Sequence, residues 1–344
     1  MKYSNNYIFY PENKALELAI GHAVGMLGEK SAEVAGIDDN VTVADNFLHT
    51  RGNFEQHHYS TNVLESAREA LEATLTEEFL DHEPLAWAAT QNSLGNILAA
   101  QGQQQRNVGL FEKAILSFQN ALEKFDREAS PQEWASTQYN LGTATQALGR
   151  QQSDVKVLKA SVDAYTNALL VWTREQMPFE WALTMHQLGV TFHSYGKLLK
   201  GNRTFQKSVV AYKNALAELD ADSSALELAS THNNQGAVLH NLSESEGNSE
   251  RLQEAIRSYE TALTVCMEQQ LPIHLAVLCR VNKSTARGDL AELTKDLAIA
   301  EETVDDFEVI IELFHNSLQP MCLTHCEEQM AKAQLLVQAL SGKG

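Results

Sequence analysis

The chain has 344 residues, with 26 Lys and Arg against 45 Asp and Glu, so its formal net charge is −19. Hydrophobic residues make up 44% of it, which is too many for a disordered chain and ample for a large core. A negative charge of this size repels phosphate backbones and anionic lipid, so binding to nucleic acid or to a membrane surface is disfavoured.

Residues 1–60 are expected to form a helical or irregular cap. The first residues have no apolar segment and no small-residue cleavage site, a pattern that predicts no secretory signal. No run in the chain approaches the length of a membrane span. Residues 1–60 hold four basic and eight acidic residues (4 − 8 = −4), which argues against a DNA-binding head. The cysteines are few and clustered late, which predicts thiols in a reducing cytoplasm: Cys266, Cys279, Cys322 and Cys326.

Residues 84–270 contain four copies of one unit with a step of 47 residues. The segments PLAWAATQNSLG, PQEWASTQYNLG, PFEWALTMHQLG and ALELASTHNNQG begin at positions 84, 131, 178 and 225. A glycine keeps this step at Gly95, Gly142, Gly189 and Gly236, and an aromatic keeps it at Phe118, Tyr165, Tyr212 and Tyr259. Four copies without drift in register indicate a repeat array.

Each unit predicts two helices. The first opens at a proline in three of the copies and is expected to end about 18 residues later at a second glycine, Gly102 in the first copy. The second helix carries Ala114, Phe118 and Ala121 on one face. Small residues such as Gly95 remove bulk where the two helices cross, and neighbouring pairs must stack because one pair cannot bury both faces.

This pattern resembles the tetratricopeptide repeat (TPR). That family has a Leu-Gly pair in its first helix and small, aromatic and small residues in its second, which correspond here to Leu94, Gly95, Ala114, Phe118 and Ala121. The usual TPR has 34 residues, so the chain resembles extended varieties, and its W-A-x-T-Q segments resemble bacterial arrays. The resemblance implies an all-α, right-handed solenoid of antiparallel helix pairs with atypical capping helices at both ends.

The same pattern extends weakly into both flanks. Residues 61–83 predict one helix, which resembles the second helix of a degenerate repeat before the first copy. After the fourth copy Pro272 keeps the step, but Lys283 falls where glycine is expected. Residues 271–344 are therefore expected to hold a degenerate repeat and then capping helices, at about 288–316 and 321–341.

The resemblance also implies a binding surface, because in TPR arrays the first helices line the concave face. The positions beside the repeat glycine that point into this groove are nearly uncharged and rich in amides and imidazoles, which suits an extended peptide backbone. The predicted groove residues are Asn92, Asn96, Tyr139, Thr143, Gln146, His186, His193, Asn233, His240 and Asn241. Asn92, Tyr139, His186 and Asn233 form a ladder with one residue per repeat, and their side chains are expected to face solvent in the free protein.

Three interpretations of function stay open. The first is a non-catalytic scaffold or regulatory adaptor in bacterial cytoplasm, which binds a protein or an extended peptide and needs no cofactor. The second is a small-molecule, metal or haem sensor that uses His186, His193 and His240. The third is a regulator that responds to a signalling peptide. No motif for nucleotide binding, serine hydrolysis or zinc proteolysis occurs, so the sequence predicts no enzyme, and it leaves the oligomeric state open.

A separate metal candidate lies near the C-terminus. Cys322, His325 and Cys326 share one helix face at i, i+3 and i+4, and these ligand types suit zinc, with His315 as a fourth candidate. The same face continues as an apolar stripe to Met330. In such a stripe the cysteine thiols pack as small hydrophobic groups. The pattern favours core packing over a metal site.

Overall fold

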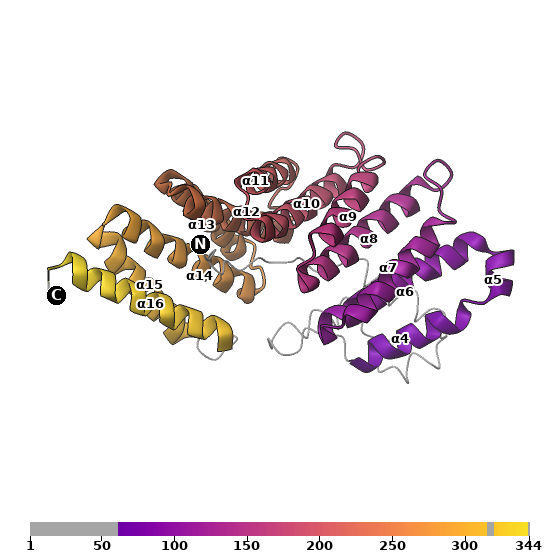
Figure 1. Ribbon diagram of the computed structural model, residues 1–344, viewed down its shortest axis with the longest axis horizontal. Coiled ribbons are helices and arrows are strands. Elements are labelled where there is room, and N and C mark those ends of the chain that lie inside the picture. The colour runs from indigo at the N-terminus through magenta and orange to yellow at the C-terminus, as the bar shows by residue number, and fades with distance from the viewer. Residues whose placement is uncertain (1–60, 315–319, 343–344) are drawn as a thin grey trace. The chain divides into compact units, whose positions relative to one another are not determined.

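The structure is a computed structural model, and it describes residues 61–314 and 320–342 (Figure 1). All regular elements in these ranges are α-helices, which confirms the predicted all-α class. None of the helices in the described ranges is long and apolar enough to cross a membrane. The chain divides into two compact units, one ending at Gln187 and the next beginning at Leu188. The expectations for residues 1–60 and for His315 lie outside the described residues.

The first unit is a series of packed helix pairs. Its helices are α4 (Thr61–Thr74), α5 (Glu77–His82), α6 (Pro84–Gln105), α7 (Val108–Leu122), α8 (Pro131–Gln152) and α9 (Val155–Ala168). α6 packs on α7 and α8 on α9, while α7 and α8 join the two pairs and α4 covers α6 (Figure 1). α10 (Pro178–Leu199) carries the boundary to the second unit.

The second unit continues the same arrangement. Its remaining helices are α11 (Asn202–Leu216), α12 (Ala225–Glu246), α13 (Ser249–Glu268), α14 (Ile273–Thr294), α15 (Leu297–Phe314) and α16 (Pro320–Leu340). From α11 to α16 each helix packs on the next, and α14 also contacts α12 and α16 (Figure 1). α16 therefore lies in contact with both helices of the last pair.

The first helices of the pairs reveal a fifth repeat with a shifted register. α6, α8, α10, α12 and α14 have 22 residues each and begin at 84, 131, 178, 225 and 273, so the last step is 48 (273 − 225). Ser284, which is fully buried, therefore takes the place of the repeat glycine, and Phe307 takes that of the aromatic (307 − 259 = 48). One extra residue before α14 explains why Lys283 stood at the expected glycine position.

The repeat glycine and the aromatic touch within each of the four pairs that carry them. A Cβ added at Gly95 would lie 2.6 Å from Cε1 of Phe118, and one added at Gly142 would lie 2.7 Å from Cε1 of Tyr165. Both rings are at most 1% exposed, so neither has room to move aside. The predicted close crossing of the helices is confirmed, and in these four pairs a larger residue than glycine would clash with the ring.

The first helices end later than the sequence predicted. α6 continues past Gly102 to Gln105, and Arg106 ends it in the left-handed conformation with φ of 50°. Gly102 serves packing instead, because a Cβ there would lie 3.2 Å from the ring of Phe111. A glycine needed for helix contact was thus mistaken for a helix terminus.

Helix α4 keeps the register of the repeats and packs against α6. Leu64 and Leu71, which stand 47 residues before Phe111 and Phe118, are fully buried. The single helix predicted over 61–83 is instead two, because the chain turns after α4 and Thr76 caps α5 by accepting from the backbone N–H of Phe79 at 3.1 Å.

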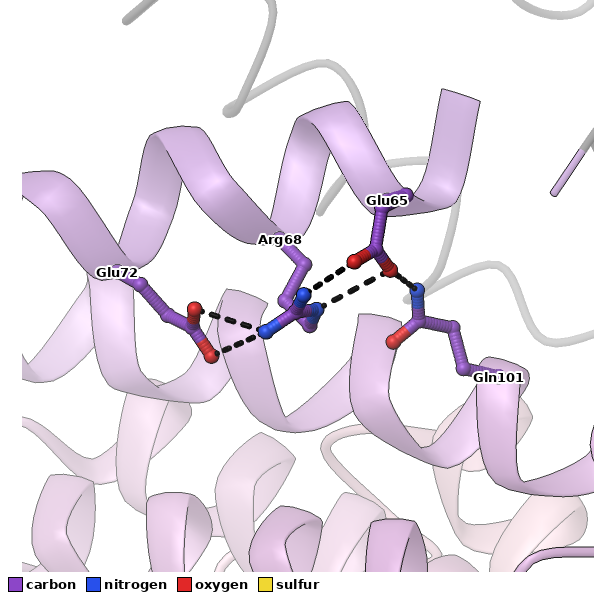
Figure 2. A network of polar contacts seen from close by, with 4 residues as sticks. All are labelled: Glu65, Arg68, Glu72 and Gln101. Carbon is purple, nitrogen blue, oxygen red and sulfur yellow. Dashed lines mark hydrogen bonds and ion pairs between the residues drawn. The ribbon is translucent and has the colours of Figure 1, made fainter. Parts of the chain in front are cut away.

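A polar network on α4 reaches across to the first repeat (Figure 2). Arg68 donates to both carboxylate oxygens of Glu72 at 2.8 and 2.9 Å, and it also pairs with Glu65. Gln101 of α6, which is 1% exposed, donates from Nε2 to Glu65 at 2.9 Å. The hydrogen bond from Arg68 is the main reason that the pKa of Glu65 lies below its usual value.

The helix predicted over 288–316 has wrong bounds. Residues 288–294 complete α14, and Lys295 then adopts the left-handed conformation with φ of 57° and separates α14 from α15. The bounds of α16, Pro320–Leu340, lie within one residue of those predicted, 321–341.

Candidate functional site

Amide side chains join neighbouring first helices at equivalent positions of the repeat. Asn140 of α8 donates from Nδ2 to Oδ1 of Asn92 on α6 at 3.1 Å. In the second unit Asn282 of α14 donates from Nδ2 to Oδ1 of Asn233 on α12 at 2.9 Å. Asn92 and Asn233 lie three repeats apart (233 − 92 = 3 × 47), so one position makes the same contact in both units.

Histidines at another repeat position form the same kind of contact. Nε2 of His193 on α10 lies 2.6 Å from Oδ1 of Asn241 on α12. Nε2 of His240 on α12 lies 2.9 Å from Oδ2 of Asp289 on α14. In each of the four bonds, the partner on the next first helix stands one residue after the equivalent repeat position. The two partners are therefore 48 residues apart in the bonds that reach α8 and α12, and 49 apart in the two that reach α14, where the step is 48 instead of 47. We call these four bonds the inter-repeat hydrogen bonds.

Most of the predicted groove residues are buried, and the prediction that the ladder residues face solvent is wrong for His186 and Asn233. The side chains that are at most 3% exposed are Asn96, Gln146, His186, His193, Asn233, His240 and Asn241. Three remain half-buried, namely Asn92, Tyr139 and Thr143. Contacts such as the inter-repeat hydrogen bonds direct these polar groups at neighbouring helices, so their place in the repeat does not leave them open to a ligand.

Burial also changes the chemistry of the histidines. The pKa of His186 is lowered to about 4 because its fully buried ring loses hydration, and burial likewise lowers the pKa of His232 to about 4. Both rings are therefore neutral at pH 7. His193 and His240 are hydrogen-bonded to separate partners, so they do not line an open wall as the sensor hypothesis requires.

A half-exposed stripe of side chains remains on α6 and α8 in the first unit. We call it the first-helix stripe, and it consists of Asn92, Ala100, Tyr139, Thr143 and Ala147. The Tyr139 ring lies 5.6 Å from the ring of Tyr165 and 5.7 Å from that of Trp172, measured between centroids. Neighbouring aromatic rings thus fix the orientation of Tyr139.

Two polar groups of the first-helix stripe differ in what they can still bind. Thr143 accepts a hydrogen bond from the Tyr165 hydroxyl at 3.2 Å and donates to the Tyr139 carbonyl at 3.1 Å. Asn92 accepts at Oδ1, whereas its Nδ2 makes no hydrogen bond within the described residues. Asn92 therefore presents an oriented donor on a half-exposed surface.

Two of the C-terminal metal candidates have surroundings that the structure describes. Cys326 is fully buried in an apolar cluster with Val281, Phe307 and Ile310. Nε2 of His325 lies 3.2 Å from the hydroxyl of Thr285, and the side chain of Cys322 is outside the described residues. Cys326 therefore occupies the core position that its stripe favoured.

Sequence reasoning missed two residues that lie beside His240. Glu244 follows it by one turn of α12, and Asp289 approaches from α14. The predicted alignment extended the 47-residue step to α14, where the actual step is 48. It was therefore wrong by one residue and did not place Asp289 opposite His240. The signal that would have found it is a shift of the fifth repeat by one residue, which places the small Ser284 at the repeat glycine and Phe307 at the repeat aromatic.

Stacked helix pairs that cross at a glycine–aromatic contact define an all-α helical-repeat protein. The sequence profile of the family described as tetratricopeptide repeat matches residues 87–128, which cover most of α6 and all of α7. The first helices of the other pairs have the same length as α6, and the glycine and aromatic within this match recur every 47 residues as far as Gly236 and Tyr259.

A comparison with solved structures finds BtubC (BKLC) from P. vanneervenii. It is 18% identical to this chain, with a TM-score of 0.47, and the match covers 75% of this chain and 94% of BtubC. No curated protein matches the chain.

Proposed function

We propose that the protein is a non-catalytic scaffold that binds an extended segment of a partner protein along the first-helix stripe. Repeats of this type generally mediate contacts between proteins. The observation that supports this stripe in particular is that Asn92, whose amide is oriented by Asn140, and Tyr139, whose ring packs against Tyr165, are both half-buried on neighbouring first helices.

The chemistry of the stripe suits a peptide backbone. Nδ2 of Asn92 can donate to a backbone carbonyl, and the ring of Tyr139 can pack against an apolar side chain of the partner. Ala100 and Ala147 are small, so they let a backbone approach the helices closely. The stripe contains no charged residue, so we expect binding to depend little on salt.

Affinity capture followed by quantitative binding tests this proposal. The variant Asn92→Ala/Tyr139→Ala is compared with the wild type, and partners captured by the wild type are then titrated against both proteins. Each single change should weaken binding about two- to tenfold, since a net hydrogen bond contributes about 0.5–1.5 kcal/mol. The double change should weaken it more.

Gln119→Ala/Thr166→Ala is the matched control, because both residues are exposed on second helices and also lie 47 apart (166 − 119). It should bind as the wild type does. Equal binding by the stripe variant and the wild type would move the interaction surface elsewhere. His186 is unsuited to this test, since it is 1% exposed and its loss would disturb the core.

A further inference from the structure

We propose that His240, Glu244 and Asp289 bind a divalent metal ion of the zinc class between α12 and α14. Their ligand atoms all lie within 4.8 Å of one another. Among the described residues, this is the group of histidine, cysteine and acidic side chains whose geometry fits a shared ion. The site lies in the second unit and does not depend on the proposed peptide binding in the first.

The two helices bring the ligands together from different directions. His240 and Glu244 are four residues apart on α12, so they project from one face. Asp289 approaches from α14, and its Oδ2 lies 2.9 Å from Nε2 of His240. Donor atoms bound to one zinc ion lie about 3.4 Å apart, so the ion requires only a small separation of this pair and an inward rotation of Glu244.

The environments of His240 and Asp289 support an ion. The His240 side chain is fully buried, while that of Asp289 is 23% exposed, so water can occupy an open coordination position. Nδ1 of His240 makes no hydrogen bond within the described residues, so the ring can carry its proton there and offer the Nε2 lone pair.

The charges also match. Two carboxylates and a neutral imidazole carry a formal charge of −2, which a divalent ion neutralises. Lys332 of α16 does not take the ligand oxygen, because its Nζ bonds to the other oxygen, Oδ1 of Asp289, at 2.8 Å. Lys332 also lies 2.8 Å from Oε2 of Glu292, so it holds the Asp289 carboxylate in place from outside, as polar neighbours of metal ligands do.

Titration with Co²⁺, a spectroscopic substitute for zinc, tests the site in the full-length protein after chelator treatment. The wild type should develop a visible d–d band that saturates at one ion per chain. No thiolate-to-cobalt charge-transfer band should appear while this first ion binds. Its absence distinguishes the site from any site that contains cysteine. Competition with Zn²⁺ should abolish the band.

Glu244→Gln and Asp289→Asn should each weaken Co²⁺ binding at least about tenfold, since each removes one ligand charge. Glu260→Gln is the matched control, because Glu260 is exposed on α13 and loses the same charge outside the proposed ligand set, and it should bind Co²⁺ as the wild type does. Circular dichroism confirms that each variant is folded, and Glu244 is half-buried, so its amide should be tolerated. Equal stoichiometry and affinity in the wild type and both ligand variants would overturn the site.

Discussion

The first helices of the two units use one repeat position in different ways. Asn92 on α6 and Asn233 on α12 are equivalent, and each accepts a hydrogen bond from an asparagine of the next first helix, at 3.1 and 2.9 Å. Asn92 nevertheless stays half-buried, whereas Asn233 is fully buried. The same side chain is therefore partly accessible in one unit and part of the core in the other.

This difference shows that repeat position determines the direction of a side chain but not its exposure. On α12 every residue from Ser230 to Ser243 apart from His232 is buried. On α6 and α8 the first-helix stripe remains accessible. Polar groups in such an array therefore join neighbouring helices in the core in one place and stay partly accessible in another.

The largest effect should come from the packing that both units share. Gly142→Leu and Gly236→Leu should each lower the free energy of unfolding by at least about 3 kcal/mol, because a Cβ at either site lies 2.7 Å from Cε1 of a buried tyrosine. Urea denaturation measures this, with Gly109→Leu as an exposed control that should change stability little. A clear difference between the two glycine variants would show that packing, too, differs between the units.

A second prediction concerns pH. The pKa of His186 is about 4 in the folded protein, against 6.5 for a free histidine side chain, so the unfolded state binds more protons between these limits. Stability should therefore fall as pH drops through this window, by about 2 kcal/mol at pH 5 and about 3 kcal/mol at pH 4 from this group alone.

Denaturation of His186→Leu at pH 7.5 and at pH 5 measures this contribution, since the variant should lose about 2 kcal/mol less than the wild type between the two pH values. His232→Leu provides the counterpart in the second unit, because burial lowers the pKa of His232 to about 4 as well. An unchanged pH dependence in the His186 variant would mean that its ring is charged or hydrated in the fold.

The smallest effect tests the comparison itself. Asn233→Ala should cost about 1–3 kcal/mol, because it removes a fully buried acceptor and leaves Asn282 to lose that bond without water as a substitute. Asn92→Ala should cost at most about 1 kcal/mol, because water can reach its half-buried site. Thermal and urea unfolding of the two variants should rank them in that order, and equal losses would contradict the contrast in exposure.

Much of the fold was predictable because periodicity encodes it locally. The 47-residue step, the two helices of each unit and the glycine–aromatic crossing all follow from spacings such as Gly142 to Tyr165. The helix ends were less predictable, since Gly102 serves a contact with Phe111 and the terminus falls on Arg106. Of the predicted groove residues, the sequence located Asn92, Tyr139 and Thr143 on a surface that is partly accessible.

Tertiary structure alone decided which polar residues are buried and which residues meet. The sequence placed His240 in the repeat by its spacing, but its pairing with Asp289 depends on how α14 sits against α12 after one extra residue. Exposure likewise depends on the neighbouring helix, so Asn92 and Asn233 cannot be told apart by their place in the repeat. Local spacing specifies where a side chain points along its own helix, whereas only the packed neighbours determine what it touches.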